Sequence, residues 1–178
     1  MSTTRVLAVL ALLCATGRGI SAQTCQVSGA AGSCVANSTA TLTAGTVLQL
    51  SIGSGSTVVP TPTLGDYDAG STIATGPAPS VKSNAPWRLQ VSSTSALFVA
   101  TNTDPIEPAR VDKPAGDLGW GLSPGGPFTA MTTTATTVVS GTRTAGTSTP
   151  IYFSVALSYA LDTPGNYSLP LLFSLISP

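Results

Sequence analysis

The sequence predicts an all-β protein, an antiparallel β-sandwich of roughly seven to nine strands. After residue 23, apolar residues recur at every second position, which is the period of a strand with one buried face. Short segments rich in Gly and Pro separate these stretches and are typical of turns. The chain has 178 residues, with 22 serines and 27 threonines but only 8% charged residues. This composition excludes the long charged helices of a coiled coil or helical bundle.

Five stretches carry the alternation, and each is predicted to be a strand. The residues that share the buried face are, in order, Leu48, Leu50 and Ile52; Trp87, Leu89 and Val91; Leu118, Trp120 and Leu122; Ile151, Phe153, Val155 and Leu157; and Tyr167, Leu169, Leu171, Phe173 and Leu175. Threonine suits such strands because its branched Cβ packs well on a pleated backbone. Pro170 interrupts the last stretch and has no N–H to donate, so we expect that strand to lie at an edge or to bulge there.

A threonine-rich run, residues 131–149, separates two of these stretches. We interpret it as two exposed strands around a turn at residues 140–146, since Val138 and Val139 lie inside it. The alternative is a flexible linker. With no repeat and no other boundary apparent, residues 23–178 are expected to form a single domain.

The first 22 residues have the pattern of a secretory signal peptide. Arg5 precedes ten apolar residues, 6–15, and small residues end the segment at Ser21-Ala22. Ten apolar residues are too few to span a bilayer, which argues against a retained anchor. Leu13 before Cys14 argues against a lipoprotein. We therefore expect cleavage after Ala22 and secretion of residues 23–178. This segment has five basic and seven acidic residues, a net charge of −2.

Cysteine usage agrees with an oxidising compartment. Removal of Cys14 with the signal peptide leaves Cys25 and Cys34, separated by a glycine-rich segment that suits a chain reversal. A redox-active pair would need closer CxxC spacing and a nearby cation. The sequence therefore predicts a structural disulfide between Cys25 and Cys34.

Signatures of catalysis are sparse. The chain has no His, the most common general base and transition-metal ligand, and no nucleophile-elbow or phosphate-loop motif. The balanced charge also argues against a nucleic-acid surface. Asp66 and Asp68 fall short of a calcium ligand set. Asp104, Glu107, Asp112 and Asp117 lie in a proline-rich stretch that resembles a solvated loop. We expect no enzyme activity, no cofactor and no metal.

Trp87 and Trp120 allow two interpretations. Both lie on alternating strands, which favours packing in the core. The functional alternative is an exposed ring that stacks on a sugar or on a partner surface. On that alternative, Trp87, Leu89 and Trp120 would form a binding site.

Two segments resemble bacterial surface domains. Trp87-Arg88-Leu89 is similar to the first W-x-L of WxL-type domains, and Gly165-Asn166-Tyr167 to the Gly-x-Tyr that begins their last strand. Phe173-Ser174-Leu175 stands in the place of the second W-x-L, with Phe in place of Trp. Pilin-like and spore-coat-U-like sandwiches end similarly. The resemblance covers about 25 residues and implies an immunoglobulin-like or pilin-like module, secreted to the cell surface, periplasm or outer envelope of a bacterium.

Two functions remain open on these grounds. The first is a structural, surface-layer or pilin-like component, which assembles with its own copies or other envelope proteins through the edge strand formed by Tyr167, Leu169, Leu171, Phe173 and Leu175. The second is a non-catalytic module of WxL type that binds peptidoglycan or another glycan. No later stretch is long enough to span a membrane, and no nucleic-acid partner is expected.

Overall fold

The computed structural model describes residues 25–26, 28, 33–36, 38–104 and 106–178. The predicted signal peptide, residues 1–22, lies outside them. Contacts divide the chain into two units, Met1–Ala44 and Gly45–Pro178. Among the described residues, no helix has the length and apolar character needed to cross a membrane.

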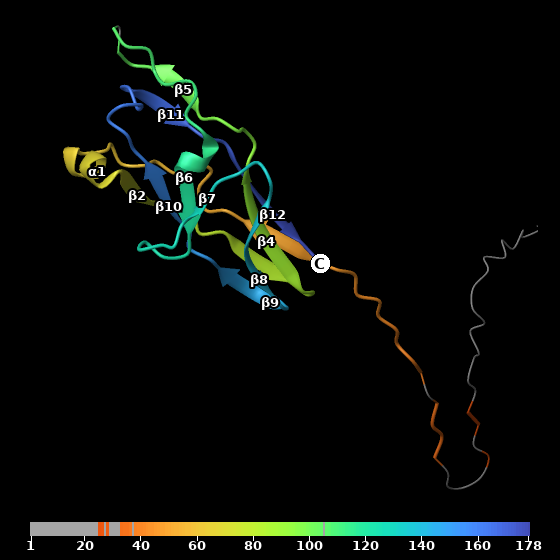
Figure 1. Ribbon diagram of the computed structural model, residues 1–178. Helices are drawn as coiled ribbons and strands as arrows, with labels where there is room; N and C mark the ends of the chain where they lie inside the picture. The colour runs from red at the N-terminus through yellow and green to blue at the C-terminus, as the bar shows by residue number, and fades with distance from the viewer. Residues whose placement is uncertain (1–24, 27, 29–32, 37, 105) are drawn as a thin grey trace, which may run out of the picture. The chain divides into compact units, whose positions relative to one another are not determined.

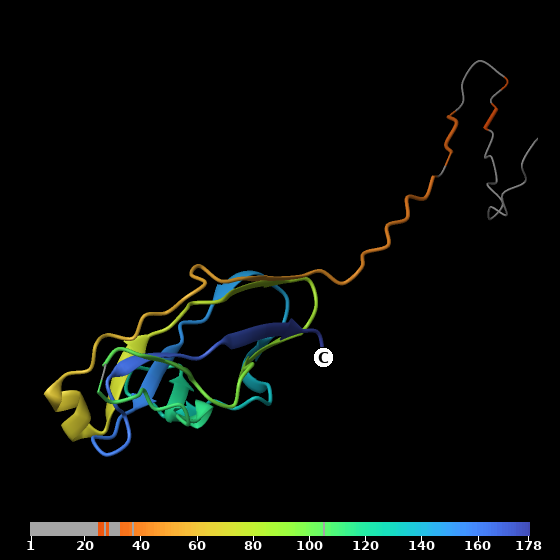
Figure 2. The same ribbon diagram turned by 90° about the horizontal axis from the view of Figure 1, so that it is seen from above.

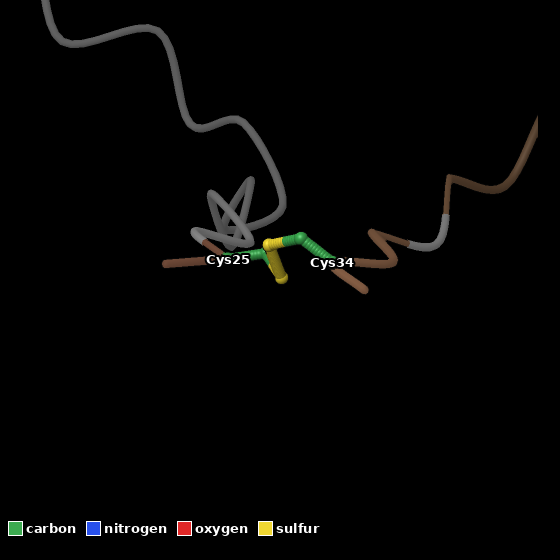
Figure 3. Close-up of a disulfide and its surroundings, with 2 residues drawn as sticks. All are labelled: Cys25 and Cys34. Carbon is green, nitrogen blue, oxygen red and sulfur yellow. A yellow bond between two sulfur atoms is a disulfide. The ribbon is translucent and has the colours of Figure 1, made fainter. Parts of the chain in front are cut away.

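The described part of the first unit contains the predicted disulfide. Cys25 and Cys34 are joined, with their Cα atoms 5.7 Å apart (Figure 3). The described residues from Ser33 to Ala44 are exposed and have neither helix nor strand. The structure thus confirms the pairing of Cys25 with Cys34.

The second unit is an all-β fold (Figure 1). Its described residues form twelve strands: β1 (Leu48–Ser51), β2 (Ser71–Thr75), β3 (Ser80–Ser83), β4 (Trp87–Ser93), β5 (Val99–Asn102), β6 (Leu118–Gly121), β7 (Thr129–Ala130), β8 (Thr136–Gly141), β9 (Thr144–Ser148), β10 (Tyr152–Ala156), β11 (Gly165–Ser168) and β12 (Leu171–Ile176). A helix α1 (Leu64–Ala69) precedes β2, and a 3-10 turn η1 (Ala115–Asp117) precedes β6.

The strands pair antiparallel in four sheets. Their orders are β1-β3-β9, β2-β10-β6-β7, β11-β5 and β12-β4-β8. Backbone hydrogen bonds join these sheets in pairs. Gly76 N donates to Ile151 O at 2.8 Å and Thr149 N to Pro79 O at 3.0 Å, so the β3–β9 ladder continues into the β2–β10 ladder. Thr94 N donates to Pro170 O at 3.1 Å and links β4–β12 to β5–β11. The arrangement is consistent with the predicted sandwich (Figures 1 and 2).

The core contains most of the residues that the alternation predicts to be buried. The buried cluster consists of Val81, Trp87, Leu89, Val91, Phe98, Leu118, Trp120, Met131, Val138, Ile151, Phe153 and Val155. Three predicted members differ. Ile52 and Leu122 lie one residue beyond the ends of β1 and β6 and are exposed. Leu157 lies one residue beyond the end of β10 and is half-buried outside the core cluster. The alternation therefore identifies buried positions only as far as the strand extends.

The helix α1 was not predicted, because the segment is too short to show a helical period. Its formation has a local cause at its first turn. Thr63 Oγ1 accepts a hydrogen bond from Asp66 N, and the Asp66 carboxylate accepts one from Thr63 N at 2.7 Å, which is a capping box. Gly70 ends the helix with a φ of +74°, a conformation that glycine adopts without strain.

The threonine-rich run contains two strands, β8 and β9, as the sequence predicts, but the predicted turn at residues 140–146 is wrong, because β8 extends to Gly141 and β9 begins at Thr144. β8 is also not fully exposed, since Val138 lies in the core. The two strands do not pair with each other. β8 pairs with β4 and β9 with β3, so the short turn between them carries the chain from one sheet to another. The sequence predicted the strands but not their partners.

Candidate functional site

The last strand, β12, is an outer strand of its sheet. It pairs with β4 from Leu171 opposite Ser93 to Ile176 opposite Arg88. On its other side, no described strand pairs with it. An edge of this kind presents unpaired backbone N–H and C=O groups and is a template for strand addition.

The side chains of β12 alternate between the core and solvent. Leu171, Phe173 and Leu175 are half-buried against the core. Leu172 and Ile176 point away from it and are 51% and 38% exposed. Three of the residues that the sequence assigned to the assembly edge therefore hold β12 against the core, and its exposed side chains are Leu172 and Ile176.

A second outer strand lies beside this edge. β1 ends the order β1-β3-β9, and its Cα atoms approach those of β12 within 8 Å without strand pairing. Leu48 and Leu50 of β1 pack against the same core. One side of the sandwich thus presents two strand edges together.

The other two residues of the predicted edge lie elsewhere. Tyr167 belongs to β11, which pairs with β5, and Leu169 lies between β11 and β12. The predicted continuous strand 167–175 is interrupted at Pro170, which has no N–H for a ladder. The Pro170 carbonyl accepts hydrogen bonds from Thr94 N and from Ser93 Oγ. Of the predicted stretch 167–175, only the part that belongs to β12 lies on this outer strand.

Tyr167 has a structural role instead. Its hydroxyl donates a hydrogen bond to the backbone oxygen of Thr163 at 2.7 Å and accepts one from Arg110 N at 3.1 Å. A tyrosine that bonds back to the backbone just before its own strand is the tyrosine corner of sandwich domains.

The predicted binding residues Trp87, Leu89 and Trp120 all lie in the core. Their exposed fractions are 3%, 0% and 7%. The Trp87 ring is packed against Gly141 of β8, its neighbour across the sheet. Neither ring faces solvent, so neither is placed to stack on a sugar. The burial of Trp87 and Trp120 supports the interpretation that both pack in the core.

Five charged side chains, from the 110–117 segment and from Asp162, form a cluster of ion pairs. Lys113 Nζ lies 2.9 Å from Asp162 Oδ1 and 3.2 Å from Asp117 Oδ2. Arg110 pairs with Asp162 Oδ1 at 3.0 Å, with Asp112 at 3.0 Å and with Asp117 at 3.5 Å. The side chains of Lys113 and Asp162 are only 3% and 5% exposed. The cluster joins the 110–117 segment to the turn after β10.

Every polar atom in the centre of this cluster has a partner. Lys113 Nζ also donates to the Ala156 backbone oxygen at 2.9 Å, and Asp162 Oδ2 accepts from Ser158 N at 2.9 Å. Burial raises the pKa of Asp162, but hydrogen bonds from Lys113 and Arg110 outweigh burial and hold that pKa below its usual value. Asp162 thus stays ionised between two cations, an arrangement that suits structural ion pairing rather than proton transfer.

The remaining acidic candidates also serve the local backbone. Asp104 Oδ1 accepts hydrogen bonds from Ile106 N and Glu107 N. Asp66 caps α1, and its hydrogen bonds with Thr63 lower its pKa. Within the described ranges, no three His, Cys, Asp or Glu side chains gather as metal ligands would. Asp112 and Asp117 belong to the ion-pair cluster.

Sequence reasoning missed two arrangements. One is the pairing of Lys113 with Asp162, which are 49 positions apart with no pattern to connect them. The other is the stacking of Tyr67 on Tyr159, whose ring centroids are 4.9 Å apart. The one feature of the sequence that could have indicated an ion pair here is the spacing of Lys113 and Asp117, which are four residues apart.

Comparison with known proteins adds no assignment. Neither a protein-family model nor a curated protein matches this chain.

Proposed function

We propose that this chain is a secreted bacterial surface protein with a structural role, which associates with its own copies through the free edge of β12. The observation that carries the proposal is the position of β12 as an outer strand with Leu172 and Ile176 exposed. Native sandwiches usually protect such edges with charged residues or proline. β12 contains neither between Leu171 and Ile176.

Two further features support an extracellular structural role. The Cys25–Cys34 disulfide suits an oxidising compartment, in agreement with the signal-peptide pattern of residues 1–22. The exposed serines and threonines give a surface with few charges to repel a second copy. The alternative is a glycan-binding module that uses Trp87 and Trp120. Because both rings are buried, their position does not support it.

The test is the oligomeric state of residues 23–178 and of one variant at the edge. We expect sedimentation velocity to show concentration-dependent association of the unaltered protein. Leu172→Lys should shift it toward the monomer, because a charge on an edge strand opposes pairing with another strand.

A matched control distinguishes an effect at the edge strand from a general effect of added charge on association. Val111 is 74% exposed and lies outside β12, so Val111→Lys adds the same charge elsewhere and should leave association unchanged. A protein that stays monomeric at every concentration would contradict the proposal. Equal loss of association in both variants would do the same.

A further inference from the structure

Two long antiparallel ladders run through the second unit. The first places β2 and β3 alongside β10 and β9, which backbone hydrogen bonds join end to end. Ser83 lies opposite Thr144 at one end of this ladder, and Ser71 lies opposite Ala156 at the other. A strand rises about 3.3 Å per residue, so the positions of Ser71 and Ser83 are roughly 40 Å apart.

The second ladder places β4 and β5 alongside β12 and β11, and it runs from Arg88 at one end to Asn102 at the other. Its ends match those of the first ladder. At one end, a short segment joins Ser83 of β3 to Trp87 of β4, and at the other the turn after β10 leads into β11. The second unit therefore has two ends, one at the β3–β4 segment and one at the turn after β10.

Three basic side chains lie at the end formed by the β3–β4 segment, which we call the basic end. Lys82 precedes the last residue of β3, Arg88 is the second residue of β4, and Arg143 lies in the turn between β8 and β9. In the described part of the chain, none of the three forms an ion pair with a carboxylate. They give this end a side-chain charge of +3.

All seven acidic side chains of the chain lie at the other end, which we call the acidic end. Tyr159 of the turn after β10 donates to Asp68 Oδ1 at 3.0 Å, and β11 pairs with β5 up to Asn102, two positions before Asp104. With the two cations of the ion-pair cluster, this end has a net side-chain charge of −5. Its carboxylates are Asp66, Asp68, Asp104, Glu107, Asp112, Asp117 and Asp162.

The strands between the two ends are uncharged. β2, β5, β9, β10, β11 and β12 contain no Asp, Glu, Lys or Arg. At physiological ionic strength the Debye length is about 8 Å, far shorter than the roughly 40 Å between the ends. Attraction between the two ends of one molecule therefore does not stabilise the fold, and their opposite charges act on whatever lies beside each end.

Exposed apolar side chains accompany the charges at both ends. At the acidic end, Leu64 is 73% exposed, Tyr159 62% and Leu161 55%. At the basic end, Val47 is 63% exposed, and its N–H donates to Asn84 Oδ1 in the β3–β4 segment at 2.7 Å. Apolar side chains with charged groups around them are typical of a surface that binds another protein.

We propose that the basic end of one copy binds the acidic end of another, so that copies associate head to tail. The two surfaces are complementary in charge, and each carries apolar side chains to bury. Such a contact is heterologous and leaves one free end of each kind, so that further copies can add to it. This inference rests on the proposed function in taking a second copy as the partner, but it uses the ends of the unit in place of the β12 edge.

Ionic strength distinguishes the two modes of association. We expect sedimentation velocity of residues 23–178 to show stronger association at about 0.01 M than at about 1 M ionic strength, because the Debye length falls from about 30 Å to about 3 Å. Pairing through β12 uses backbone hydrogen bonds and apolar side chains and persists at about 1 M, so Leu172→Lys and Val111→Lys are compared there. Association that is absent at low ionic strength, or does not weaken with salt, would overturn the head-to-tail contact. Association that persists at about 1 M would still support β12.

One charge reversal at each end tests the surfaces themselves. Arg143 and Glu107 are both exposed. At low ionic strength, Arg143→Glu and Glu107→Lys should each weaken association about tenfold. A mixture of the two variants should associate more strongly than either alone, because each supplies the unaltered end that the other lacks. A variant that fails to fold would not regain association in the mixture.

The matched control is the double variant Thr75→Glu with Ala78→Glu. It changes the net charge by −2, as Arg143→Glu does, but at exposed positions near the middle of the first ladder. We expect it to associate as the unaltered protein does, and amide spectra establish that each variant is folded. Equal weakening in the control and in Arg143→Glu would overturn the proposal, as would a mixture that associates no better than its components.

Discussion

Trp87 shows how one side chain depends on the residue opposite it. Its ring is 3% exposed and lies over Gly141, its partner in the β4–β8 register. A Cβ added at Gly141 would stand 2.6 Å from Trp87 Cζ2 and 2.8 Å from Cε2. Because the ring is enclosed by the core, it has no room to move away. Glycine at this position is therefore a packing requirement.

We predict that Gly141→Ala lowers the free energy of unfolding by about 1–3 kcal/mol, the usual cost of overpacking a core. Urea denaturation followed by the fluorescence of the tryptophans measures this change. Gly146→Ala is the matched control, since a Cβ at Gly146 in β9 would meet no atom within 4 Å. Equal stability of the two variants would show that the Trp87 ring adjusts without cost.

At the scale of the element, one residue changes the course of the last strand. The alternation from Tyr167 to Leu175 predicts a single strand, but Pro170 divides it into β11 and β12, which pair with different strands. β11 and β5 form a two-stranded ribbon (Figure 1). A pair of strands is only marginally stable alone, so the ribbon needs contacts to the remainder of the fold.

Tyr167 supplies such contacts through its hydroxyl, which bonds to Thr163 O and Arg110 N. We predict that Tyr167→Phe lowers the free energy of unfolding by about 1–2 kcal/mol, because Arg110 N and Thr163 O lose their partner. Tyr152→Phe should have little effect, since the Tyr152 hydroxyl bonds to no described residue. Hydrogen exchange of β5 and β11 amides should accelerate in the Tyr167 variant alone.

At the scale of the whole molecule, the ion-pair cluster joins segments that are far apart in sequence. Asp162, in the turn after β10, meets Lys113 and Arg110 before β6. Removal of one partner from a buried ion pair leaves the remaining charge uncompensated and lowers the free energy of unfolding. This cluster therefore couples global stability to the ionisation of a single carboxylate.

The pKa of Asp162 lies below its ordinary value of 3.8 in the folded protein. A carboxyl with a depressed folded pKa contributes stability that is present above the unfolded pKa and is lost as pH falls through the folded pKa. We predict that the unaltered protein loses this contribution progressively below about pH 4. Denaturant titrations between neutral and acidic pH measure it.

Asp162→Asn should cost about 3 kcal/mol at neutral pH and make the acid-dependent loss of stability shallower. Glu107→Gln is the matched control, because Glu107 is exposed. An unchanged pH profile in the Asp162 variant would show that the acid sensitivity arises from other carboxyls.

The sequence alone determined the all-β class and most of the core, because a period of two assigns each side chain to a face of its strand. It also determined the Cys25–Cys34 disulfide, whose partners are nine positions apart. Periodicity does not identify the strand with which each strand pairs. Tertiary structure therefore decided that β11 and β12 pair with different strands, that Trp87 and Trp120 turn inward, and that Lys113 meets Asp162. Each of these depends on contacts between residues distant in sequence, which local patterns do not encode.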